Sequence, residues 1–168
     1  MLLKPQDILV LLKLAVRGNQ DFSYAPLAAE LGMSASEVHS AVQRAREAGL
    51  IAPDEVRPLT APLLEFLVHG LRYVLPLKRG ALGRGMPTAH AAAPLRDQIV
   101  FGDEPPPVWP DPKGTARGET CEPIYLSVVT AAKKDRKLYE CLALVDALRG
   151  GRARERKLAE TYLRQRFM

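Results

Sequence analysis

Six polar side chains lie close together in the stretch LAAELGMSASEVHSAVQRAREAGLI, which covers residues 27–51. Glutamine can form two hydrogen bonds with adenine, serine and histidine can reach bases or phosphates, and arginine can reach either. The candidate side chains are Ser34, Ser36, His39, Ser40, Gln43 and Arg44. A solvated helix face is the competing interpretation of His39 and Gln43.

Basic side chains gather elsewhere, although phosphate neutralisation dominates the affinity of proteins for nucleic acid. The stretch 27–51 itself has two arginines against three glutamates. A second candidate set lies on or beside the glycine-rich segment RGALGRG at 79–85: Arg72, Lys78, Arg79 and Arg84. Flexible backbone with basic side chains suits phosphate or minor-groove contact. The alternative is a solvated loop whose charge maintains solubility.

Residue types used in catalysis form no recognisable motif. His39, His69 and His90 lack the i, i+4 spacing of a histidine metal pair. Cys121 could form a metal site with His69 and His90 only if the fold happened to bring the three side chains together. We find no phosphate-binding loop, serine elbow or paired carboxylates. Cys141 falls on an apolar helical stripe, which favours a buried free thiol in a reducing compartment. We therefore predict a non-enzymatic protein with no metal and no cofactor.

The composition favours a globular, mostly helical protein. The chain has 168 residues, of which 47% are hydrophobic and 6% aromatic. Its abundant alanine and leucine favour helix over strand. No apolar run approaches the roughly 20 residues of a membrane span, and charges interrupt the N-terminal segment. A cytoplasmic protein without membrane contact is the expectation.

Apolar spacing predicts four helices that position the first set of polar residues. They cover 5–17, 26–31, 34–48 and 61–69, with glycine stops after the first three. Gly32 ends the second helix, because glycine tolerates the left-handed turn conformation. Ser34 and Glu37 have capping-box spacing at the start of the third. Glu37 could instead accept a bond from cytosine, but we favour the cap.

The period changes after the fourth helix. Leu71, Tyr73, Leu75 and Leu77 alternate, which predicts a strand over 71–78. A basic loop follows at 79–85, and residues 86–90 could return as a second, edge strand. Residues 94–123 are rich in proline and glycine without periodicity, so we expect an extended surface arm or a partly disordered linker. We interpret Trp109 as a buried anchor of that arm, in preference to a partner-docking polyproline segment.

The C-terminal part is predicted to be a helical hairpin, with helices over 135–149 and 153–165 separated by Gly150 and Gly151. Residues 149–168 carry seven basic and two acidic groups. The last helix also has an apolar stripe of Leu158, Tyr162 and Leu163. That stripe favours packing on the preceding helix or on a second subunit. Contact with the DNA backbone and simple solvation are the other interpretations of its charge.

The apolar and small residues of 27–51 have the spacing of a tight helix-turn-helix: Leu27, Ala28, Leu31, Gly32, Met33, Val38, Ala41 and Val42. In this pattern the stretch resembles the helix-turn-helix of bacterial winged-helix transcriptional regulators of the broad MarR type. The resemblance covers about residues 3–92, and the segment 71–90 would be the wing. It implies a winged helix-turn-helix domain over 1–92. The proline-rich arm at 93–123 and the C-terminal helices at 124–168 lie outside the resemblance, and we expect the C-terminal helices to dimerise.

In such a domain the third helix enters the major groove and the wing contacts the backbone or the minor groove. The resemblance thus implies a sequence-specific regulator, such as a repressor, that binds double-stranded DNA. Together with the expected pairing of the C-terminal helices, this predicts a homodimer. The alternative is a winged-helix interaction module or an antitoxin-like repressor. Its proline-rich arm would hold a toxin or a defence-system partner. The near-neutral third helix fits that alternative.

Overall fold

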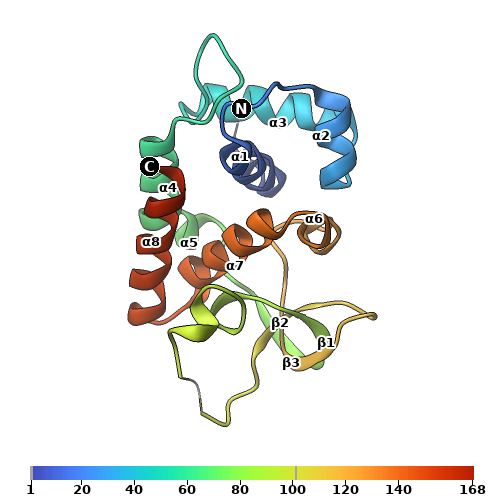
Figure 1. Cartoon of the computed structure of the whole chain (residues 1–168), viewed down its shortest axis with the longest axis vertical. Coiled ribbons are helices and arrows are strands. Elements are labelled where there is room, and N and C mark those ends of the chain that lie inside the picture. The colour runs from blue at the N-terminus through green and yellow to red at the C-terminus, as the bar shows by residue number, and fades with distance from the viewer. Residues whose placement is uncertain (1, 101) are drawn as a thin grey trace.

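The structure is a computed structural model that describes residues 2–100 and 102–168, and it is mostly helical with one small sheet (Figure 1). The described helices are α1 (Pro5–Arg17), α2 (Tyr24–Leu31), α3 (Ala35–Glu47), α4 (Thr60–His69), α5 (Leu71–Val74), α6 (Val128–Lys134), α7 (Arg136–Gly150) and α8 (Ala153–Phe167). The strands are β1 (Arg79–Pro87), β2 (Pro107–Pro110) and β3 (Ala116–Cys121), with short 3₁₀ turns η1 (Ala89–Ala91) and η2 (Leu95–Asp97).

Local capping signals determine where the first helices begin. The Lys4 backbone N–H donates to the Asp7 carboxylate at 2.8 Å at the start of α1, where proline occupies the first position. At the start of α3, Ser34 N–H donates to Glu37 at 2.7 Å, and Glu37 N–H donates to the Ser34 hydroxyl at 3.1 Å. These bonds confirm the predicted capping box and the preferred role of Glu37.

The α2–α3 turn is tight because Gly32 adopts a left-handed conformation, with φ of 64°. Helix α2 packs on α3, and α3 also packs on α1. The buried contact residues of α3 are Val38, Ala41, Val42 and Ala45, which follow helical spacing. These small side chains allow the helix axes to approach closely.

The strand predicted over 71–78 is wrong, because residues 71–74 form the helical turn α5. Leu71 is fully buried and continues the apolar face of α4 set by Leu64 and Leu67. Tyr73, which the alternation placed on the same face as Leu71, is 76% exposed. A few alternating apolar residues also fit the end of a helical stripe, and here packing on α7 selects the helix.

The prediction of a basic loop at 79–85 is also wrong, because this segment belongs to strand β1. β1 pairs with β2 and β3 in antiparallel directions, and β2 pairs with β3 in parallel, so the three strands close on one another. The glycines permit this closure. A Cβ atom at Gly85 would collide with the Trp109 carbonyl, and one at Gly118 would collide with that of Pro106.

The proline-rich arm is thus a structural part of the sheet rather than a surface linker. Its Trp109 is 1% exposed, which confirms the buried anchor. The indole N–H donates to Asp146 of α7 at 2.7 Å, and the Thr88 hydroxyl donates to the same oxygen at 2.7 Å. Arg149 donates to the other Asp146 oxygen at 2.8 Å and to the Leu75 carbonyl at 2.7 Å. This buried polar cluster joins α7 to the sheet and to the segment after α5.

The C-terminal helices match their predicted ranges closely, but the sequence pattern missed α6. Leu163 and Ala159 of α8 are fully buried, and α8 packs on α7, α4 and α1. The apolar stripe of α8 therefore packs within the chain. One hydrophobic core runs from Ile8 to Leu163, and it includes residues from each of the three predicted segments. No helix within 2–100 or 102–168 is long and apolar enough to cross a membrane.

Acid is expected to remove the stabilisation that Asp135 provides at the start of α7. Asp135 accepts from Lys13 Nζ at 2.6 Å and from Leu138 N–H at 3.2 Å. Burial raises the pKa of Asp135, but Lys13 and the backbone donors outweigh it, and the net pKa lies below 3.8. Because the folded pKa is depressed, the contribution is complete above pH 3.8 and is lost as the pH falls through the folded value.

Urea midpoints of the wild type and of Asp135→Asn test this expectation. The variant should be less stable at pH 7, and the difference should shrink as the pH falls to 3. Asp54→Asn is the control, because Asp54 is exposed on a loop. An equal difference at both pH values would show that the carboxylate charge is not what stabilises this junction.

Candidate functional site

The solvent-facing side of α3 carries most of the first set of predicted site residues. Ser36 and His39 are exposed, and Ser40 and Gln43 are partly exposed. The His39 ring packs on Tyr24 with 5.3 Å between ring centroids, which orients it from α2. Gln43 Oε1 accepts from Arg46 at 3.3 Å. The structure therefore brings these four polar residues together on one helix face.

Arg44 does not belong to that face, which corrects its predicted role. It is 7% exposed, and its guanidinium donates to both carboxylate oxygens of Asp7, at 2.8 and 2.7 Å. Asp7 is fully buried in α1. This bidentate pair ties α3 to α1, so Arg44 is not available to a ligand. Ser34 is exposed, but its hydroxyl is engaged as the helix cap.

A short hairpin follows α3 directly and was missed in the sequence. Ile51 and Pro58 form an antiparallel bridge, Ala52 N–H donates to the Arg57 carbonyl at 2.9 Å, and Leu59 N–H donates to the Leu50 carbonyl at 2.9 Å. The signal was the turn segment PDEV between the apolar pair at 50–51 and the proline at 58. The tip carries two acids and then Arg57, which bonds Glu55 at 2.7 Å.

The second predicted set does not gather on one basic hairpin. Arg72 lies on α5, where its guanidinium is 5.4 Å from the ring centroid of Tyr73. Lys78 and Arg84 are exposed before and within β1. Figure 1 shows the sheet and α3 toward opposite ends of the long axis. The sheet therefore does not stand beside α3 as the predicted wing would.

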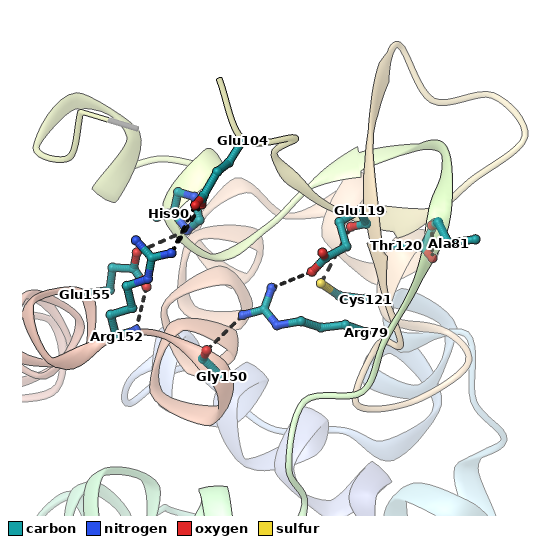
Figure 2. A network of polar contacts seen from close by, with 10 residues as sticks. All are labelled: Arg79, Ala81, His90, Glu104, Glu119, Thr120, Cys121, Gly150, Arg152 and Glu155. Carbon is teal, nitrogen blue, oxygen red and sulfur yellow. Dashed lines mark hydrogen bonds and ion pairs between the residues drawn. The ribbon is translucent and has the colours of Figure 1, made fainter. Parts of the chain in front are cut away.

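Arg79 is engaged within the chain in a polar network shown in Figure 2. It donates to Glu119 of β3 at 3.0 Å and to the Gly150 carbonyl at 2.8 Å. Arg152 pairs with Glu104 at 3.2 Å in the same network. These groups line a cavity of about 720 Å³ between residues 99–100 and 102–107, the sheet and the α7–α8 junction. Because its charges pair with one another, we interpret the network as an attachment of the sheet to the helices.

His90 also lines this cavity, 3.6 Å from Glu155. Burial lowers the pKa of His90 below 6.5, despite the opposing effect of Glu155. Burial raises the pKa of Cys121 to about 11 and that of Cys141 to about 12, so both thiols are protonated at neutral pH. The described residues contain no group of three or more histidine, cysteine or acidic side chains placed to hold a metal ion.

Comparison with known proteins does not assign the chain to a family. No protein-family model matches the chain, and neither a curated protein nor a solved structure shows significant similarity to it. Any functional assignment therefore depends on the site residues themselves.

Proposed function

We propose that the chain is a sequence-specific double-stranded DNA-binding transcriptional regulator that presents α3 to the major groove. The supporting observation is the polar face of α3, held on α1 and α2 by a tight turn, with Ser36, His39, Ser40 and Gln43 turned outward. An α-helix fits the major groove, where these side-chain types can bond base edges. Ser34 would contribute as a helix cap that holds the N-terminal end of α3.

We place the wing of this winged-helix unit at the hairpin of residues 50–59, not at 71–90. Its position immediately after the third helix supports this placement, and Arg46 Nε donates to the Ala52 carbonyl at 3.1 Å, which ties it to α3. Its charge is low, with Arg57 close to Asp54 and Glu55. If Arg46 and Arg57 neutralise two phosphates per chain, the slope of log affinity against log salt should be roughly −2 per chain.

Loss of the α3 face should weaken specific DNA binding by at least about tenfold, since one bidentate base contact contributes roughly 1–3 kcal/mol of discrimination. The change is the double variant His39→Ala, Gln43→Ala. Selection of bound duplexes from a random library would first supply the target sequence. Electrophoretic shifts on the selected duplex and on a scrambled one would then measure the affinity and its sequence preference.

The matched control is Gln98→Ala, Gln165→Ala, which removes two exposed polar side chains outside α3. It should bind the selected duplex like the wild type. Enrichment of no sequence by the wild type, or equal affinity of the wild type and the α3 variant, would contradict the proposal. Dyad symmetry in the selected sequence would support a homodimer, whose half-sites should lie about 34 Å or a multiple apart.

The acidic hairpin tip favours a second candidate function, which is docking of a protein partner on the α3 and hairpin face. Asp54 and Glu55 are exposed there and would repel phosphate. A partner with a basic surface, such as a toxin encoded beside this protein, would suit them. Co-expression with the neighbouring gene product distinguishes the two functions. A complex that Asp54→Lys, Glu55→Lys disrupts, without DNA retention at low salt, would favour docking.

A further inference from the structure

A second polar groove lies between the end of α4, α5 and the first turns of α8. Its cavity of about 310 Å³ is separate from the network of Figure 2 and lies at the low end of ligand-pocket volumes. Figure 1 shows α8 running beside α4. Residues 68, 69, 72 and 73 line one side, and α8 lines the other with helical spacing through 153, 156, 157 and 160. The two sides are therefore held by packed helices.

The groove is cationic. Arg72 lines it from α5, and Arg156 and Lys157 line it from α8. The one acid among the lining residues is Glu160, whose carboxylate accepts from Arg164 at 3.0 Å. Arg156 donates to the Gly151 carbonyl at 3.2 Å, and a guanidinium has five N–H donors in all. Three positively charged side chains around a small cavity suit a phosphate group.

An exposed aromatic ring stands beside these charges. Tyr73 lines the groove and is 76% exposed. The Arg72 guanidinium is 5.4 Å from its ring centroid, so the cation and the ring are held together. An exposed tyrosine ring keeps apolar surface in contact with water, and a base stacked on it would remove that surface from water. Basic groups next to an exposed aromatic ring are the recurring elements of sites for unpaired nucleotides.

We propose that this groove binds a nucleoside phosphate, with the phosphate on Arg72, Arg156 and Lys157 and the base stacked on Tyr73. The ligand is either a free nucleotide or one unpaired nucleotide of a strand, since both present the same chemistry. The site uses no residue of α3 and does not depend on the proposed regulator function. A regulator could use it for an effector, and a docking protein could use it to hold a nucleic acid.

Titration calorimetry on the full chain tests the site with four nucleoside monophosphates, a ten-nucleotide single strand and ribose 5-phosphate. Arg72→Ala, Lys157→Ala should weaken all phosphate ligands by at least about tenfold, given the strength of charged hydrogen bonds. Tyr73→Ala should weaken nucleotides by about tenfold but leave ribose 5-phosphate unchanged, whereas Tyr73→Phe should retain stacking. Binding of monophosphates identifies a free nucleotide as sufficient, and binding of the strand alone identifies an unpaired nucleotide in a chain.

The charge-matched control is Lys137→Ala, Arg154→Ala, because both side chains are exposed and lie outside the groove lining. It should bind like the wild type. Absence of binding by every probe, or an equal loss in the control, would overturn the proposal. The α3 variant His39→Ala, Gln43→Ala should retain nucleotide binding, so failure of the groove and failure of the major-groove interface give different results. Circular dichroism confirms that each variant remains folded.

Discussion

Arg44→Ala is expected to lower the free energy of unfolding by about 3–5 kcal/mol, because it leaves the Asp7 carboxylate buried without its partner. Asp7 is fully buried, and Arg44 supplies two of its hydrogen bonds. The loss should appear as a lower urea midpoint at pH 7, with little change in the slope of unfolding free energy against urea. The effect would be on folding and not on ligand contact, in contrast to the role expected from the sequence.

A paired replacement separates charge burial from DNA contact. Asp7→Leu, Arg44→Met removes both charges and fills the space with apolar side chains, so its stability should recover most of the loss, short of about 1 kcal/mol for the Lys4 N–H cap that Asp7 also accepts. If α3 binds DNA through its outward face, this double variant should also retain affinity for the selected duplex. If Arg44→Ala had wild-type stability but bound DNA more weakly, Arg44 would contact DNA rather than stabilise the core.

Asp146→Ala should be at least as damaging, with a loss of roughly 3–5 kcal/mol and weaker attachment of the sheet. Asp146 is 2% exposed and accepts from Thr88, Trp109 and Arg149. Burial raises the pKa of Asp146, and the charge of Arg149 opposes that rise. Alanine would leave the Arg149 guanidinium without its counter-charge and the indole N–H without its acceptor in the core. Thermal unfolding followed by Trp109 emission measures the effect, since the buried indole reports on sheet attachment.

Two further variants make this prediction specific. Asp146→Asn keeps an oxygen acceptor for the indole but leaves Arg149 without its counter-charge, so its stability should lie between those of the wild type and the alanine variant. Asp97→Ala removes an exposed carboxylate on η2 and should be neutral. If Asp146→Ala unfolds at the wild-type temperature with unshifted Trp109 emission, the cluster does not hold the sheet.

The parts that could be predicted from sequence are those with local causes. The first helix was predicted at its observed bounds, and the start of α3 follows from the reciprocal bonds of Ser34 and Glu37. Gly32 was identified as the turn residue because glycine is the residue type that most readily adopts the left-handed conformation, whatever its distant neighbours. The burial of Trp109 was also predicted correctly, because a large apolar ring in a segment otherwise rich in proline, glycine and charge favours an anchor in the core.

The parts that could not be predicted depend on distant partners. The segment 79–85 resembles a flexible loop, because glycine has no side chain to indicate a strand. It becomes β1 through pairing with residues about 25–40 positions later, as in Gly85 with Pro110 and Leu82 with Glu119. Arg44 was assigned to the outward face because its type suits DNA, while its buried partner Asp7 lies 37 positions earlier.

The sequence by itself determined the longer amphipathic helices, the capping box of α3 and the polar composition of α3, because these depend on residues within a turn or two of one another. Only the tertiary structure decided which polar residues face solvent. It placed Arg44 in the core, used Arg79 to attach the sheet, and brought Arg72 of α5 beside the basic turns of α8. The physical reason is that hydrogen bonding and charge pairing select partners by distance in space, and that distance exists only after the core has packed.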